Sequence, residues 1–235
     1  MSSVFYAVTQ ATILTWAATA LGAALVFVTP RLPRRALATL LAVAAVLMSW
    51  AALAGLLAPA LADFTAWWGL GPAMVVTALA LAVGAGVSIA VRRCIAGLDE
   101  HGPTLGRQLF LVMSLHHVPE GMAVGLAVTA AHHGDALASV GAWTLVAAMA
   151  SHNAVEGALV SIPLRQEGAS RVRAWSMGQL SGVAEVFGAF IGAGTMTLSA
   201  MLLPWGLGLA AGAMLAVVLA DLLPEVRRSW ATAAT

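Results

Sequence analysis

Two short stretches of this sequence repeat the same polar pair inside otherwise apolar segments. The stretch LHHVPEG contains His116 and Glu120, and the later stretch SHNAVEG contains His152 and Glu156 at the same spacing. Residues four apart lie on one face of a helix, so each stretch presents an imidazole beside a carboxylate. Imidazole nitrogen with carboxylate oxygen suits Zn²⁺, Fe²⁺, Mn²⁺, Co²⁺ or Cd²⁺, whereas an all-oxygen set would suit Mg²⁺ or Ca²⁺.

Further polar residues join these pairs. Glu185, in QLSGVAEVFGA, is a third carboxylate within an apolar segment, and His117 and Asn153 directly follow the two histidines. A carboxylate at the centre of a bilayer costs about 3 kcal/mol to insert, so the three carboxylates require either protons or metal ions to neutralise them. The potential ligands exceed the four of a structural zinc site. This favours two adjacent metals or one open, exchangeable site.

The composition indicates that a lipid bilayer surrounds these segments. The chain of 235 residues is 61% hydrophobic and 9% charged, whereas about a quarter of the residues in soluble domains are charged. The N-terminal apolar run lacks the basic start of a secretory signal, which predicts a retained first helix. Apolar runs predict about seven transmembrane helices in one integral membrane domain, 1–235. The predicted helices are 4–28, 36–61, 72–91, 106–131, 137–162, 172–202 and 205–223.

The basic residues predict the orientation of these helices. All eleven are arginines, and they lie after the first, third, fifth and seventh predicted helices, which places them on one side of the membrane. The other side carries Asp63, His132, His133 and Asp135 instead. Because cytoplasmic loops carry an excess of basic residues, we expect a multi-pass plasma-membrane protein with its N-terminus outside and its C-terminus in the cytoplasm.

A weak internal repeat links the second and seventh predicted helices. LMSWAALAGLLAP, at 47–59, resembles AMLAVVLADLLPE, at 213–225, with Met48 and Met214 at matching positions. The predicted topology runs these helices in opposite directions. Inverted repeats of this kind are common in secondary transporters.

The polar motifs resemble those of one known family. HHVPEGMAVG and HNAVEGALVSIP are similar to the paired His-Asn-x-Pro-Glu-Gly signatures of the ZIP family of divalent-metal transporters. SGVAEVFGA resembles the sixth-helix motif of that family, and GAMLAVVLADLLPE resembles the end of its seventh helix. The resemblance runs from Gly106 to Glu225 and points to the bacterial broad-specificity branch, which implies a location in the bacterial inner membrane.

The resemblance implies a binuclear metal centre between the fourth, fifth and sixth helices. The main transport site would consist of His116, Glu120, His152 and Glu156. The second site would consist of His117, Asn153 and Glu185, with Glu120 and Glu156 bridging the two metals. Met48 falls where that branch places a methionine near the site.

Three features depart from the family pattern. His117 stands where an asparagine is usual, which adds a softer ligand to the second site. Ala154 and Val155 stand where many members have Ile-Pro, which predicts a straighter fifth helix. The family has eight helices, whereas the apolar runs here predict seven, so the expected fold is an all-α, ZIP-like bundle without the eighth helix.

These observations predict transport of divalent transition-metal ions, with zinc uptake toward the cytoplasm as the first expectation, and no enzymatic activity. Two alternatives remain open: an intramembrane metal-dependent hydrolase, which would use the metal to activate water, and a non-transporting metal sensor or subunit. No cofactor is expected beyond the transported or bound metal. The expected partners are divalent metal ions, the lipid bilayer and a second copy of the chain, with no nucleic acid.

Overall fold

The computed structural model describes residues 2–29, 33–96, 104–132 and 136–233, and the regular structure in these residues is entirely helical. Seven helical spans are long and apolar enough to cross a membrane. This confirms the predicted all-α membrane bundle. The spans are Ser3–Val28, Arg35–Trp68, Leu70–Cys94, Leu105–His132, Ala138–Gln166, Arg171–Leu198 and Leu203–Ala231.

Several spans are built from more than one helical element. The first comprises α1 (Ser2–Ala23) and α2 (Leu25–Val28); the second comprises α3 (Arg34–Trp50), the π-helical segment η1 (Ala51–Leu57) and α4 (Ala58–Trp68). The next three are single helices: α5 (Leu70–Ala96), α6 (Leu105–His132) and α7 (Ala136–Gln166). The sixth comprises α8 (Arg171–Ser181) and α9 (Val183–Leu198); after the short η2 (Ala200–Leu202), the seventh comprises α10 (Leu203–Val217), the π-helical η3 (Val218–Leu222) and α11 (Leu223–Ala233).

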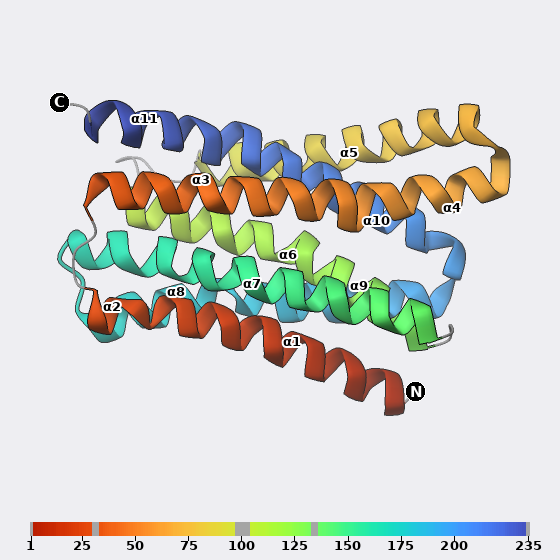
Figure 1. Cartoon of the computed structure of the whole chain (residues 1–235), viewed down its shortest axis with the longest axis horizontal. Helices are drawn as coiled ribbons and strands as arrows, with labels where there is room; N and C mark the ends of the chain where they lie inside the picture. Colours follow the sequence, from red (N-terminus) through yellow and green to blue (C-terminus); the bar gives the residue numbers. More distant parts are fainter. Residues whose placement is uncertain (1, 30–32, 97–103, 133–135, 234–235) are drawn as a thin grey trace.

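The spans form two groups that lie one above the other in Figure 1. The first group, here called the four-span bundle, contains α1, α2 and α6–α9, in which α6 packs on α9 and α1 packs on α7. The second, the three-span bundle, contains α3, η1, α4, α5, α10, η3 and α11, in which α10 packs on α5 and α11 packs on α3. The segments that contain His116 and Glu120, His152 and Glu156, and Glu185 therefore all lie in the four-span bundle.

Glycines let α6 and α9 approach until their backbones touch. A Cβ on Gly121 would lie 1.9 Å from the Glu185 carbonyl oxygen, and a Cβ on Gly125 would lie 1.9 Å from that of Ala189. The contact is reciprocal, because a Cβ on Gly188 would lie 2.2 Å from the Val118 carbonyl oxygen. Small residues at such spacing are typical of close helix pairs in membranes. The contact holds the segment that carries Glu185 directly against the segment that carries Glu120.

Two helices continue further than the apolar runs predict. The second span reaches Trp68 and the seventh reaches Ala231, whereas the predicted ends are 61 and 223. In both, a π-helical segment lies just before a proline, Pro59 after η1 and Pro224 after η3. A local π adjustment accommodates a proline that would otherwise interrupt the helix. Figure 1 shows that the two spans run in opposite directions, as an inverted repeat requires.

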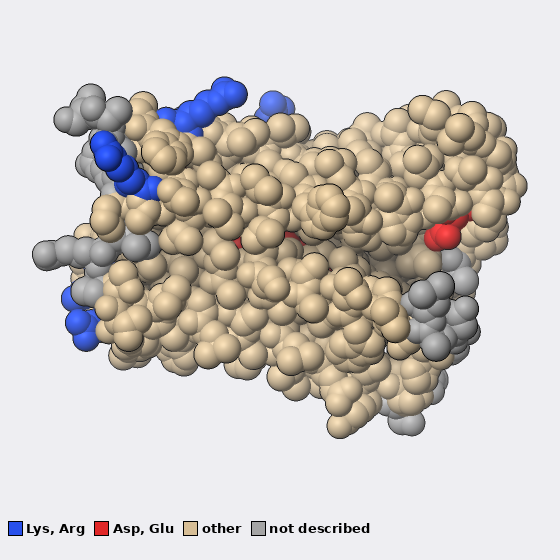
Figure 2. Space-filling model, viewed as in Figure 1, with Lys and Arg blue, Asp and Glu red and all other residues tan. Residues whose placement is uncertain are grey.

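The arginines gather at one end of the molecule. Figure 2 shows the blue side chains toward its left-hand end, where Figure 1 places the ends of α2, α5, α7 and α11. The middle of the visible surface is almost free of charged side chains. This end is called the arginine end below.

Candidate metal centre

Three helices of the four-span bundle bring seven candidate ligands to the middle of the molecule. Helix α6 supplies His116, His117 and Glu120, α7 supplies His152, Asn153 and Glu156, and α9 supplies Glu185 in its first turn. Each of the seven is at most 1% exposed. The four-residue spacing of each His-Glu pair puts its members on one face of α6 or α7, and these two faces meet.

The first group of ligands surrounds one carboxylate. His152 Nε2 lies 2.6 Å from Glu120 Oε1, and His116 Nε2 lies 3.0 Å from the same oxygen. His116 Nε2 is also 3.7 Å from Glu156 Oε1. His116, Glu120 and Glu156 each offer a ligand atom within 4.8 Å of the others. Such an arrangement can close around a single cation, because metal–ligand bonds of about 2.0–2.2 Å place neighbouring ligand atoms a few ångströms apart.

The second group lies beside the first and shares Glu156. His117 Nε2 is 3.3 Å from Glu156 Oε2, and Asn153 Nδ2 donates a 2.6 Å hydrogen bond to Glu185 Oε2. His117 Nδ1 lies 2.6 Å from the Met113 carbonyl oxygen. A carbonyl only accepts, so this contact assigns the proton to Nδ1 and leaves Nε2 of the neutral ring as an acceptor. Two acceptors, His117 Nε2 and Glu156 Oε2, therefore face each other.

The unsatisfied polar atoms of the molecule concentrate here. Among the described residues, eleven buried side-chain nitrogen or oxygen atoms have no hydrogen-bond partner, and eight of them belong to the candidate ligands. Buried polar atoms are normally paired, so this concentration needs an explanation. Among the described residues, Glu120 and Glu156 form ion pairs with histidines and with no arginine or lysine. A cation bound between these atoms would satisfy them together.

Helix α1 forms a further wall of the centre, which was not predicted from the sequence. Thr15 and Thr19 are buried, and the Thr15 carbonyl oxygen lies 3.5 Å from Asn153 Nδ2. Close packing against α7 explains this position, since a Cβ on Gly157 would lie 2.0 Å from the Thr19 carbonyl oxygen. A signal existed in the sequence, because Thr9, Thr12, Thr15 and Thr19 recur at helical spacing.

A cavity of about 690 Å³ approaches the centre from the end opposite the arginines. It is lined by residues of α3, η1, α4, α6, α7 and α10, including Asp63, and reaches Ala148, one helical turn before His152. Access from the arginine end is filled by an apolar cluster that contains Met48, Met113 and Leu222. The centre is therefore closer to open space on the arginine-free side.

Two other candidates from the sequence, Met48 and His132, have the following neighbours. Met48 is fully buried in the apolar cluster just described, together with Met113. The polar turn after the fourth helix begins at His132, whose Nε2 atom lies 2.9 Å from Ser3 Oγ. His133 and Asp135 lie outside the described residues.

More than half of the chain is similar to known zinc transporters. Residues 100–232 match the family described as ZIP zinc transporter. The chain is 36% identical over 121 residues to zinc transporter ZIP11 of Homo sapiens, which is 52% of this chain and 35% of that protein. It is 34% identical over 135 residues to zinc transporter GufA of Myxococcus xanthus, which is 56% of this chain and 51% of that protein. Zinc transporter ZIPB of Bordetella bronchiseptica is 34% identical over 119 residues, 51% of this chain and 37% of ZIPB.

Proposed function

The chain belongs to the ZIP zinc transporter family, and from this premise we propose that it transports divalent transition-metal ions, zinc foremost, into the cytoplasm. The family comprises transporters rather than enzymes, which removes the intramembrane hydrolase. The similarity to the bacterial zinc transporters GufA and ZIPB supports a bacterial inner-membrane location. The mixed nitrogen and oxygen ligands also suit Fe²⁺, Mn²⁺, Co²⁺ and Cd²⁺, so the proposal includes a broad metal specificity.

One observation carries this proposal: two buried acceptors face each other at the centre. His117 Nε2 and Glu156 Oε2 are 3.3 Å apart, and neither has a hydrogen-bond partner. Two lone pairs at this distance are stable only with a proton or a metal ion between them. A metal ion accounts for the other unpartnered nitrogen and oxygen atoms of the cluster as well, because each can become a ligand.

The ligand set divides into two adjoining metal positions in this proposal. His116, Glu120, His152 and Glu156 hold the principal transported ion. His117, Asn153 and Glu185 hold the second, with Glu120 and Glu156 bridging. Asn153 supports this role because its Oδ1 atom is buried without a partner, whereas its Nδ2 is fixed by Glu185.

The distribution of charge supports the direction of transport. We assign the arginine end to the cytoplasm by the positive-inside rule, so the cavity beside Asp63 opens to the outside. A metal ion enters there and replaces protons on the histidines and carboxylates, because these groups bind metal only when deprotonated. It leaves when the apolar cluster around Met48 and Met113 separates from the centre.

The decisive experiment measures metal uptake into liposomes that contain the purified full chain. Zn²⁺, Fe²⁺, Mn²⁺ and Cd²⁺ are compared for the unchanged protein, Glu120→Gln and His152→Ala, and bound metal is determined by elemental mass spectrometry. Thr129→Val is the matched control, since its hydroxyl is buried and unpartnered but is not a candidate ligand. We expect saturable uptake that both ligand variants abolish and the control retains.

Other outcomes separate the remaining functions. Tight metal binding without uptake, lost in Glu120→Gln, would contradict transport and favour a sensor or a subunit that needs a partner. Uptake unaffected by both ligand variants would contradict the proposed centre. The mass of the purified particle, measured by light scattering, tests the proposed homodimer of the single 1–235 membrane domain.

A further inference from the structure

The two positions of the proposed centre differ in the atoms that they offer to a metal ion. The principal position contains two imidazoles, those of His116 and His152, whereas His117 supplies the single nitrogen ligand of the second position. The other ligands of the second position all offer oxygen atoms: Asn153, Glu120, Glu156 and Glu185. Without His117, the second position would therefore be an all-oxygen site.

The His117 ring is held with one nitrogen directed at the second position. Its Nδ1 atom donates to the Met113 carbonyl oxygen, one turn earlier on α6, at 2.6 Å. Its Nε2 atom lies 3.3 Å from Glu156 Oε2 and has no hydrogen-bond partner, and the side chain is completely buried. A hydrogen bond at the other ring nitrogen fixes the orientation of a metal-binding histidine. The lone pair of Nε2 can therefore reach a metal ion without a change in the side-chain conformation.

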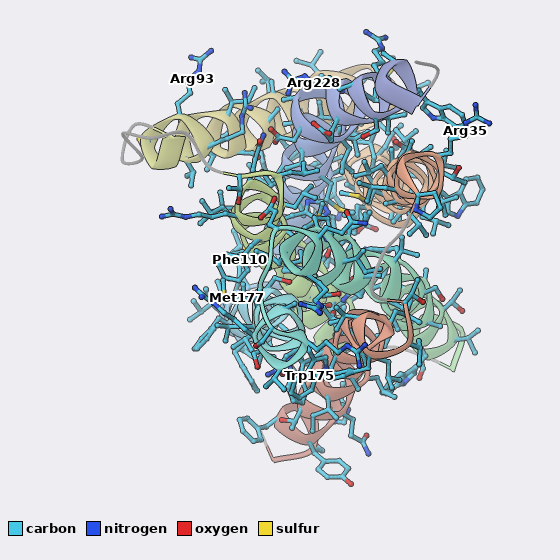
Figure 3. The ribbon with its side chains drawn as sticks, turned by 90° about the vertical axis from the view of Figure 1, so that its left-hand side faces the viewer. Arg35, Arg93, Phe110, Trp175, Met177 and Arg228 are labelled. Carbon is cyan, nitrogen blue, oxygen red and sulfur yellow. The ribbon has the colours of Figure 1, made fainter. Side chains whose placement is uncertain are left out.

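Charge attracts divalent cations to the centre but does not choose among them. The three buried carboxylates, those of Glu120, Glu156 and Glu185, attract Mg²⁺ and Ca²⁺ as well as Zn²⁺, because the Coulomb energy depends on charge and distance alone. The basic side chains lie elsewhere: Figure 3, which looks onto the arginine end, shows Arg35 and Arg93 pointing away from the helices. Selection among divalent cations must therefore come from the type of ligand atom.

We propose that His117 makes the second position select zinc and similar transition metals over Mg²⁺ and Ca²⁺. This inference rests on the proposed function, because it requires the two metal positions. Imidazole suits Zn²⁺ and Fe²⁺, whereas Mg²⁺ and Ca²⁺ bind through oxygen ligands. The nitrogen of His117 thus stabilises bound zinc and adds little to the binding of a hard cation. The principal position has two imidazoles, so the selectivity of the second position alone depends on a single residue.

Equilibrium dialysis of the purified full chain tests this inference, with Zn²⁺ and Mg²⁺ as the probes. The zinc concentration is fixed, Mg²⁺ is either absent or in large excess, and both bound metals are determined by elemental mass spectrometry. We expect the unchanged protein to hold two zinc ions per chain in either condition. His117→Gln replaces the nitrogen ligand with an amide oxygen of similar reach. This variant should hold two zinc ions without Mg²⁺, and one zinc and one Mg²⁺ when Mg²⁺ is in excess, because its second position is then an all-oxygen site.

Two further variants are matched to this substitution. His116→Gln makes the same change at the principal position, where His152 still supplies a nitrogen, so it should keep both zinc ions in excess Mg²⁺. His132→Gln removes an exposed histidine outside the centre and should behave as the unchanged protein does.

Three results with His117→Gln would overturn the proposal. These are retention of both zinc ions in excess Mg²⁺, loss of zinc with no Mg²⁺ in its place, and an equal exchange of zinc for Mg²⁺ in His116→Gln. An unchanged protein that binds fewer than two zinc ions would contradict the two-position centre, and this inference with it, before any variant is compared. Absence of uptake is a separate result: it would contradict transport, whereas the selectivity of binding is measured without it.

Discussion

The four-span and three-span bundles differ in where their helices touch. Within each bundle, glycines bring backbones together: α6 meets α9, α1 meets α7, and α5 meets α10, where a Cβ on Gly84 would lie 2.0 Å from the Leu209 carbonyl oxygen. Between the bundles, the described glycines meet only side chains. A Cβ on Gly206 would lie 2.5 Å from Leu126 Cδ1, and one on Gly55 would lie 3.0 Å from Leu145 Cδ1.

This difference bears on how a transporter built in this way can move. A backbone contact fixes the position of one helix relative to the other. Leucine side chains can change rotamer, so helices that meet through them can slide past each other. The seven candidate ligands of the centre all lie within the four-span bundle, so they keep their geometry if that bundle moves as a unit. The three-span bundle carries both π-helical segments. We therefore expect relative motion at the side-chain contacts between the bundles, with α1 moving together with the ligands.

The largest expected effect comes from breaking a backbone contact at the metal centre. Gly121→Val would place a branched side chain on the Glu185 carbonyl oxygen and force α9 away from α6. Overpacking typically costs about 1–3 kcal/mol, and here it also moves Glu185 and Glu120 apart. We expect loss of both zinc binding and uptake, and a lower melting temperature.

Gly86→Val provides the matched comparison for that substitution. A Cβ on Gly86 would meet nothing within 4 Å, so this variant adds the same side chain without a clash. Elemental analysis and thermal unfolding should show normal metal content and stability. Normal zinc binding by Gly121→Val would mean that the close approach of α6 and α9 does not position the ligands.

The next largest effect should come from joining the two bundles covalently. In a Cys94→Ser background, the pair Leu126→Cys and Gly206→Cys lies across the side-chain interface. Oxidation to a disulfide should lower zinc uptake more than about tenfold while zinc remains bound, and reduction should restore it, because motion between the bundles is blocked. The pair Ala80→Cys and Gly208→Cys lies within the three-span bundle and is the control. Uptake that survives the first cross-link would place the motion elsewhere.

Local patterns in the sequence predict part of this structure, whereas contacts between distant helices cannot be read from them. The paired His-x-x-x-Glu spacing predicts ligands on one helical face, and the structure brings His116, Glu120, His152 and Glu156 together as expected. These are local patterns, so one sequence is enough to read them. The contribution of α1 depends on contacts between helices that are distant in the chain. A single glycine such as Gly157 allows a close contact but does not show which helix makes it. The length of the seventh span could not be predicted either, because a proline inside a helix ordinarily interrupts it. Here the π-helical segment η3 accommodates Pro224, and the helix continues.

A smaller effect is expected from the ion pair inside the three-span bundle. Asp221 is mostly buried and pairs with the half-exposed Arg92, which joins η3 to α5. Such pairs contribute about 0–1 kcal/mol when one partner is accessible to solvent, so Asp221→Asn should lower the melting temperature slightly and leave zinc binding unchanged. Binding is measured by isothermal titration and stability by thermal unfolding. If uptake falls more than about tenfold with binding intact, a change too large for the loss of such a pair, Asp221 would be part of the exit path.

The smallest effect should come from Met48, which tests whether the three-span bundle contributes a ligand at all. Its thioether is fully buried within the apolar cluster that also contains Met113 and Leu222. Leucine has nearly the same volume, and such exchanges usually cost less than about 1.5 kcal/mol. We therefore expect Met48→Leu to keep zinc uptake within about twofold, because packing is conserved. Cd²⁺ provides the sharper measurement, since soft metals prefer thioether and thiolate ligands. Selective loss of Cd²⁺ uptake, with Zn²⁺ uptake retained, would show that Met48 binds metal during transport, and the ligand set would then extend across the interface between the two bundles.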